Sequence, residues 1–143
     1  MLPRWHVILG AVFTFIFSII FPNVQVFYLA LMFLSTFLID FDHYVVATMK
    51  NRHISLIRAF RYYDLRRVKE EENKSRGIRE KGDFHLFHTI EFHLIVLALG
   101  FLWGGFFYIF IGMVFHSLVD IIDLKRTDLL YVREFWLLKR FFE

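Results

Sequence analysis

The sequence predicts an all-α membrane protein, with four transmembrane helices in two hairpins and amphipathic helices at the membrane surface. Three observations predict this fold. Apolar residues make up 57% of the 143 residues, and 20 of them are Phe, which is more apolar surface than a soluble domain of this length can bury. Four apolar segments each approach the ~20 residues that cross a bilayer core. Basic residues gather on one side of these segments. We therefore treat residues 1–143 as a single membrane domain.

The four expected spans are separated by turn signals. Pro22-Asn23 follows the first segment and Gly104-Gly105 follows the third, so each pair forms a tight helical hairpin. The segments are too long for strands and lack strict alternation. No small-residue cleavage site follows the first segment, so we expect a retained span rather than a signal peptide. The expected spans are Trp5–Phe21, Val24–Val46, Phe84–Trp103 and Phe106–Ile122.

The distribution of charge predicts the orientation. Of 17 Lys and Arg, 11 lie between Ala47 and Asp83, five follow Asp123, and Arg4 precedes the first span. Positive residues mark the cytoplasmic side, so the loop 47–83 and both termini are expected there, in an integral cytoplasmic (inner) membrane protein. The sequence pI of about 9.3 then reflects topology and anionic headgroups, and no nucleic-acid partner is expected. The chain has no Cys, which excludes thiolate metal sites.

Two segments outside the spans are expected to lie on the membrane surface. The loop after Asn51 mixes apolar and basic residues at roughly helical spacing. We expect Ile54, Ile57 and Phe60 to face lipid, and the headgroups to contact Arg58, Arg61 and Arg66. The charged stretch 69–81 is expected to be a loop. A cap at Thr127 or Asp128 opens a segment that contains four charged residues, so we predict an interfacial helix over 127–142 rather than a fifth span. The aromatic faces allow a homo-oligomer.

Carboxylates and histidines gather at one end of three spans. Hairpin topology brings these ends to one depth, near the cytoplasmic surface. Ionisable groups in apolar segments are costly and usually mark function. A mixture of His with Asp or Glu suits a divalent ion such as Zn²⁺ or Mn²⁺. The residues are Asp40, Asp42 and His43 at the end of the second span, His85, His88 and Glu91 at the start of the third, and His116, Asp120 and Asp123 at the end of the fourth.

Helical spacing supports a shared centre. His116 and Asp120 are four residues apart and share one helix face. His85, His88 and Glu91 follow one another at three-residue steps, which predicts a stripe along one helix. Asp42 points inward only if its helix loosens there. Each helix thus offers two or three ligands, as in four-helix metal bundles, and the surplus over four predicts two ions or one ion with a large outer shell.

The remaining ionisable residues are less clearly placed. His93 lies off the stripe and is left open as a ligand, and Asp123 is either a ligand or a partner of nearby cations. His6 is expected to be an interfacial residue and His53 to be solvated. Ser117 beside His116 is a weak nucleophile candidate.

Three short motifs in this order resemble the LexA-regulated, membrane-bound metal-dependent hydrolases. They are Asp40-x-Asp42-His43, a later His pair, and His116-Ser-Leu-Val-Asp120. The family's middle motif has two His five residues apart beside Arg, Gly and Thr. Here His88-Thr-Ile-Glu-Phe-His93 keeps that spacing but not those neighbours. The middle ligands are therefore either His88 with His93 or His85 with His88. The resemblance implies a metal-dependent hydrolase whose substrate is undefined.

The leading functional hypothesis is a metal hydrolase acting at the cytoplasmic membrane surface on an amphipathic, phosphoester-type substrate. Glu91 is the expected general base. The substrate phosphate is expected to contact Arg52, Arg58 or Arg61. The alternatives are a di-iron membrane oxidoreductase and a non-enzymatic metal-binding membrane protein. The expected metal ligands are Asp40, Asp42, His43, His85, His88, His93, His116 and Asp120.

Overall fold

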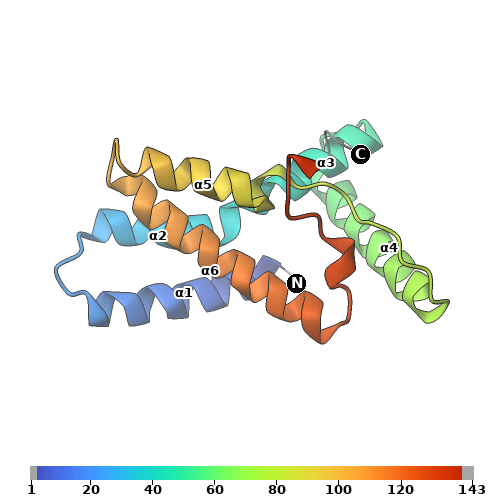
Figure 1. The fold of residues 1–143 in the computed structure, drawn as a ribbon, viewed down its shortest axis with the longest axis horizontal. Coiled ribbons are helices and arrows are strands. Elements are labelled where there is room, and N and C mark those ends of the chain that lie inside the picture. The colour runs from blue at the N-terminus through green and yellow to red at the C-terminus, as the bar shows by residue number, and fades with distance from the viewer. Residues whose placement is uncertain (1–2, 140–143) are drawn as a thin grey trace.

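A computed structural model describes residues 3–139, and these are all helical or irregular, with no strand among them (Figure 1). The helical fold class is therefore confirmed. The α-helices are α1 (Pro3–Ile20), α2 (Val26–Leu38), α3 (Phe41–Asn51), α4 (Leu56–Ser75), α5 (Ile90–Leu99) and α6 (Gly105–Arg126), with 3₁₀ turns η1 (Leu86–His88) and η2 (Leu130–Val132).

Helix α6 lies at the centre of the bundle and packs on α2, α1 and α5 (Figure 1). Small residues allow this close packing. A Cβ at Gly112 of α6 would overlap the Met32 carbonyl and the Ser35 hydroxyl of α2, and a Cβ at Gly10 of α1 would overlap the Thr36 side chain. Small residues let helix backbones approach closely, as in membrane helix pairs. These contacts hold α1, α2 and α6 together near the buried His116.

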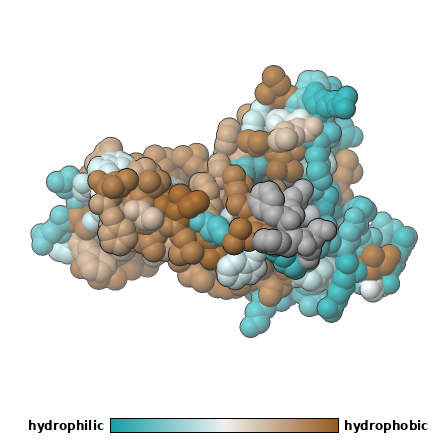
Figure 2. All heavy atoms as spheres, turned by 45° about the horizontal axis from the view of Figure 1, so that its top comes forward, coloured by the Kyte–Doolittle hydropathy of each residue, from teal (hydrophilic) through white to brown (hydrophobic). Residues whose placement is uncertain are grey.

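Polar side chains fill much of the interior, and apolar side chains cover the bundle. The buried apolar cluster contains only Ile39, Val96 and Met113, with partly buried aromatic and aliphatic neighbours. Within residues 3–139, ten polar or charged residues are buried, while Phe15 and Ile19 of α1 are 67% and 63% exposed. In Figure 2, hydrophobic atoms cover the bundle and hydrophilic atoms gather at the α4 side. This distribution suits a lipid-facing exterior.

Two helices are long and apolar enough to cross a membrane. They are Val26–Asn51, which joins α2 and α3, and Gly105–Arg126. The other two apolar helices, Arg4–Ile20 and Ile90–Leu99, are shorter. Two helices of this kind are weaker support for a membrane location than four spans would be. The four-span topology therefore stays a prediction.

The third expected span is not one continuous helix from Phe84 to Trp103. The chain before Ile90 forms an irregular segment and the turn η1, and α5 begins only after Thr89. The Thr89 hydroxyl caps this helix by accepting the Phe92 N–H at 3.3 Å. His85 and His88 therefore do not share an α-helical stripe with Glu91, as the spacing had predicted.

The second expected span loosens where the first motif lies. Helix α2 ends at Leu38 and α3 begins at Phe41. Across the break the Asp40 N–H bonds the Phe37 carbonyl and the His43 N–H bonds the Asp40 carbonyl, which are three-residue rather than four-residue steps. This is the loosening that sequence spacing required for Asp42 to point inward.

Helix α4 is longer than expected. Ser55 caps its N-terminus, and the helix continues to Ser75, into the stretch 69–81 that was expected to be a loop. Ile54 and Ile57 are 83% and 80% exposed, as the prediction of a lipid-facing side requires.

The prediction of an interfacial helix over 127–142 is wrong for the described residues. Residues 127–139, here called the C-terminal strap, contain the turn η2 and an extended stretch after it. Beyond the short bonds of η2, such as that from the Val132 N–H to the Leu129 carbonyl, their backbone groups bond to distant segments. The Gly82 N–H donates to the Val132 carbonyl at 2.8 Å, and the Ile90 N–H donates to the Phe135 carbonyl at 2.9 Å. The last three residues of the predicted helix lie outside the described residues.

Candidate metal centre

His116 on α6 is fully buried and is oriented by the backbone of α2. Its Nδ1 lies 2.8 Å from the Thr36 carbonyl oxygen. A carbonyl oxygen only accepts, so Nδ1 carries the proton and donates it. The Nε2 atom then presents its lone pair to the interior of the site. A His whose second ring nitrogen is fixed in this way is typical of metal ligands.

His88 in η1 is oriented by the carboxylate of Asp42. Its Nδ1 lies 3.1 Å from Asp42 Oδ2, which also accepts the Phe87 N–H at 2.9 Å. Asp42 thus holds both the ring and the backbone of the turn. The His88 Nε2 consequently faces the His116 Nε2 at 3.1 Å. With both Nδ1 atoms engaged by acceptors, two ring nitrogens at this separation need a proton or a cation between them.

Two carboxylates complete this arrangement. Asp40 Oδ1 lies 3.5 Å from His88 Nε2 and 3.4 Å from His116 Nε2. Asp120 Oδ2 lies 4.0 Å and 3.6 Å from the same two nitrogens. Ligand bonds of about 2.0–2.1 Å around tetrahedral Zn²⁺ place ligand atoms about 3.3 Å apart. The spacing therefore fits one small divalent cation. We call Asp40, His88, His116 and Asp120 the central group.

A second group adjoins the first, and Asp40 lies within reach of both. His43 Nδ1 lies 3.0 Å from Asp42 Oδ1 and 3.5 Å from Asp40 Oδ1. The ring of His85 stacks on His43 at 3.7 Å, and its Nδ1 lies 3.8 Å from Asp42 Oδ1. Among the described residues this buried Nδ1 has no hydrogen-bond partner. We call Asp42, His43 and His85 the second group. Among the described residues, four sets of three could hold a metal ion, and they are His88–His116–Asp120, His6–Asp40–His116, Asp40–His43–His88 and Asp42–His43–His85.

His6 belongs to this site, and its expected interfacial position is wrong. It is only 2% exposed, its Nε2 lies 3.1 Å from Asp120 Oδ1, and its ring stacks on His116 at 4.0 Å. It therefore orients one carboxylate and one imidazole of the central group from behind. The sequence contained a signal for this role, because His6 opens the first apolar segment at the same end as the other clusters.

Two expected site residues do other work. His93 lies on α5 and bonds the Thr89 carbonyl and the Ser117 hydroxyl, at 2.8 Å and 3.1 Å. It joins none of the four possible metal-binding groups among the described residues, and neither does Asp123. Both oxygens of Glu91 accept backbone N–H groups of the C-terminal strap, at 3.0 Å and 3.1 Å. Glu91 thus anchors the strap, and the general base expected there has no geometric support.

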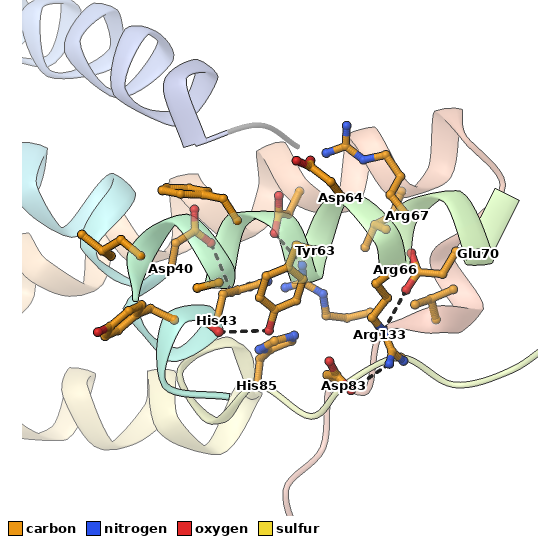
Figure 3. A pocket seen from close by; sticks show the side chains of 18 residues that line it. Asp40, His43, Tyr63, Asp64, Arg66, Arg67, Glu70, Asp83, His85 and Arg133 are labelled. Carbon is orange, nitrogen blue, oxygen red and sulfur yellow. Dashed lines mark hydrogen bonds and ion pairs between the residues drawn. The ribbon is translucent and has the colours of Figure 1, made fainter. Parts of the chain in front are cut away.

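A pocket of about 350 Å³ opens beside both groups, between α3, α4 and the C-terminal strap (Figure 3). Asp40, His43, His85 and Asp120 line its inner side. The opposite side carries Leu56, Ala59, Phe60 and Tyr63 of α4, with Arg66, Arg67 and Arg133 at the polar end. The pocket therefore joins an apolar surface to a cationic one directly over the candidate ligands.

The arginines of this pocket differ from those expected. Arg52, Arg58 and Arg61 do not line it. Arg66 and Arg67 lie further along α4 than Arg58 and Arg61, on the part of the helix that faces the pocket. Arg133 comes from the C-terminal strap, and no local pattern predicted its approach.

Asp83 organises the polar end of the pocket and is 9% exposed. It pairs with Lys50, bonds the Tyr62 hydroxyl at 2.7 Å, and pairs with Arg66 at 3.0 Å. Burial alone would raise the pKa of Asp83, but the Lys50 and Tyr62 hydrogen bonds and the Arg66 charge hold that pKa below its usual value. Asp83 is therefore ionised at neutral pH.

Two ionisable residues of α4, Glu70 and Tyr63, have pKa values that burial raises. Burial raises the pKa of Glu70, and Arg66 only partly offsets the rise. Burial and the negative charge of Asp83 raise the pKa of the Tyr63 phenol. Tyr63 therefore stays protonated and donates to the His43 carbonyl at 3.0 Å. This bond holds α4 against the break in the second span.

Comparison of the chain with family models, with curated proteins and with solved structures gave no match. The resemblance based on the three motifs therefore stays a prediction. The geometry of the two groups and the pocket carries the functional argument.

Proposed function

We propose that the chain is a membrane-embedded, metal-dependent hydrolase whose site lies at the cytoplasmic interface and acts on a phosphoester or other amphipathic, lipid-like substrate. One observation carries the proposal. His88 and His116 face each other at 3.1 Å with two carboxylates beside them, and Asp40 and Asp120 of this group also line the pocket. Buried metal ligands that open into a pocket are typical of a catalytic rather than a structural site.

The membrane placement is supported by the surface of the bundle. Exposed apolar side chains cover α1, and more lie at the N-terminal end of α4. The basic loop 47–83 and the basic C-terminal residues adjoin the same ends of the apolar segments as the metal groups, and this charge pattern supports a site at the cytoplasmic surface. A substrate held there keeps its apolar part in lipid and its polar part at the ions.

The residues of the chain divide this work. His88, His116, Asp40 and Asp120 hold one ion, and the second group with the shared Asp40 holds another. Zn²⁺ and Mn²⁺ fit this set of imidazole and carboxylate ligands. A bound ion of this kind supplies an acidified water and polarises the scissile bond. Thr36, Asp42 and His6 orient the ligands, and Leu56 and Phe60 give the apolar part of the substrate a surface.

The test measures metal and activity together in the purified protein. Metal analysis of the wild type is expected to give one to two equivalents of Zn²⁺ or Mn²⁺, and a soluble phosphoester is expected to be cleaved. The Asp42→Ala, His116→Ala double variant should lose both. His53→Ala, which changes an exposed His outside both groups, should lose neither. Full metal content and activity in the double variant would contradict the proposal. Iron with visible absorption would indicate an oxidoreductase.

A further inference from the structure

We propose that Arg133 is a phosphate ligand of this pocket, and that it is released from Asp120 for this role when a metal ion binds. The inference rests on the proposed function and specifies its substrate group. The geometry assigns Arg133 two alternative partners. In the metal-free site it occupies a metal ligand, and in the loaded site it faces the substrate phosphate.

The first step of the argument is that Arg133 and the metal use the same oxygen. An Arg133 guanidinium nitrogen donates to Asp120 Oδ2 at 2.6 Å. That same oxygen lies nearest the facing nitrogens of His116 and His88, at 3.6 Å and 4.0 Å. The other oxygen, Oδ1, is held by His6 at 3.1 Å. A cation bound by Oδ2 takes electron density from the bond to Arg133, so the two positive charges compete for Asp120.

The second step is that Arg133 already lies at the pocket. Its side chain is 13% exposed, and the residue lines the cavity together with Asp40 and His43 (Figure 3). The C-terminal strap fixes its backbone on both sides, through the Gly82 bond to Val132 and the Lys81 pair with Glu134 at 3.2 Å. Only the side chain has to move. A guanidinium offers five donors in a planar fork, which suits two oxygens of a phosphate.

The third step is that the other two arginines of the pocket are less suited to bind a phosphate beside the metal ligands. Arg66 pairs with Asp83 at 3.0 Å and with Glu70 at 3.3 Å. Arg67 lies on the exposed side of α4, and Figure 3 shows it near Asp64. Arg133 is thus the arginine that lies between the central group and the cavity. Its charge is best placed for an anion that also contacts a bound metal.

This arrangement couples the two ligands. Metal binding releases the guanidinium, which favours phosphate binding, and by reciprocity phosphate binding favours metal binding. Replacing Arg133 therefore has two effects of opposite direction. The variant binds metal more tightly when phosphate is absent, because the competing cation is gone. It also loses the enhancement by phosphate. A merely structural role for Arg133 predicts weaker metal binding instead.

The experiment titrates Mn²⁺ into the full-length, detergent-solubilised protein by calorimetry, with and without inorganic phosphate. In the wild type, phosphate is expected to tighten Mn²⁺ binding at least about fivefold. Arg133→Gln should bind Mn²⁺ at least about fivefold more tightly than the wild type without phosphate, and should show no enhancement. Arg133→Lys keeps the charge and should behave between the two. Arg61→Gln, an exposed arginine outside the pocket, should match the wild type.

Two results would overturn the inference. One is equal or weaker Mn²⁺ binding by Arg133→Gln that retains its helical circular dichroism, and the other is an undiminished phosphate enhancement in that variant. If Arg133→Gln does not fold, the same comparison is made with Arg133→Lys. Absence of any Mn²⁺ or Zn²⁺ binding by the wild type would contradict the proposed function itself, so the two failures are distinguishable.

The source of the phosphate is read from a second probe. Dihexanoyl phosphatidate carries the same phosphate group with short acyl chains. If the ligand is a lipid headgroup, this probe tightens Mn²⁺ binding more than inorganic phosphate does, and Phe60→Ser removes the difference. Equal enhancement by the two probes supports the subsite with free phosphate as its ligand. Enhancement by neither probe overturns the inference.

Discussion

The two sides of the pocket are stabilised by different interactions. On the bundle side, Asp120 is carried by α6, which packs on α2 through Gly112, and Asp40 follows the end of α2 beside the buried His88 and His116. On the α4 side, Tyr63 and Arg66 are held by a hydrogen bond and ion pairs, and α4 carries a single buried residue, Ala59. The difference indicates a pre-organised set of ligands that faces a wall with more freedom to admit a substrate.

The largest expected effect tests the packing of the bundle side. Gly112→Val places a branched side chain against the Met32 carbonyl and should separate α6 from α2, which lowers the unfolding free energy by about 3 kcal/mol. Because His116 is one turn away, metal binding should weaken as well. SDS titration followed by circular dichroism measures the stability. Gly104→Val is the control, since no atom lies near its Cβ position. Equal stability of the two variants would contradict the close packing.

His6 tests whether contacts that orient the metal ligands on the bundle side affect metal binding. His6→Phe keeps a ring to stack on His116 but removes the contact with Asp120 Oδ1. Loss of such outer contacts usually weakens metal binding by about tenfold to hundredfold. Calorimetric titration with Mn²⁺ measures the change. His53→Phe, an exposed position, should bind as the wild type does. An unchanged affinity in His6→Phe would leave the ring only a packing role.

Asp83 tests the α4 side, and its effect should depend on pH. Asp83→Asn should lower the protection of residues 78–88 against hydrogen exchange by about 1 kcal/mol at pH 7. The folded pKa of Asp83 lies below its ordinary value of 3.8. Its contribution is therefore complete above that value and is lost as the pH falls through the folded pKa. The hydrogen-exchange protection of Asp83→Asn and of the wild type should therefore become equal in acid.

The control for Asp83 is Asp64→Asn, which changes a carboxylate on the exposed side of α4, the helix that Asp83 contacts through Tyr62 and Arg66. Asp64→Asn should leave the hydrogen exchange of residues 78–88 unchanged both at pH 7 and in acid. A difference between Asp83→Asn and the wild type that does not shrink as the pH falls below 3.8 would show that side-chain shape rather than charge holds this wall.

The same division explains what could be predicted from the sequence. On the bundle side, apolar periodicity and hairpin topology placed Asp40, His116 and Asp120 together, because regular helices carry positions in sequence into positions in space. His6 was missed by treating a lone His as a surface residue, although the rule that gathered the other clusters applied to it.

On the α4 side, the contacts join segments that are far apart in sequence. The C-terminal strap was predicted as a helix because its composition is amphipathic. Its backbone instead bonds to Gly82 and Ile90, and Glu91 caps it through side-chain contacts. Local pattern carries no information on such pairings. Arg133, and with it the cationic end of the pocket, could be found only in three dimensions.

The smallest expected effect concerns a polar pair that resembles catalytic machinery but lies outside both groups. Ser117 lies 3.1 Å from His93 Nε2, and His93 Nδ1 donates to the Thr89 carbonyl, so the pair has the geometry of a base and a hydroxyl. It does not line the pocket. Such hydrogen bonds between membrane helices contribute about 0.6 kcal/mol. Ser117→Ala should lose about that much stability, with Mn²⁺ affinity and phosphoesterase activity unchanged. Ser18→Ala, whose hydroxyl bonds only within α1, provides the matched control. A loss of activity in Ser117→Ala at constant metal content would move the chemistry from the metal groups to this pair.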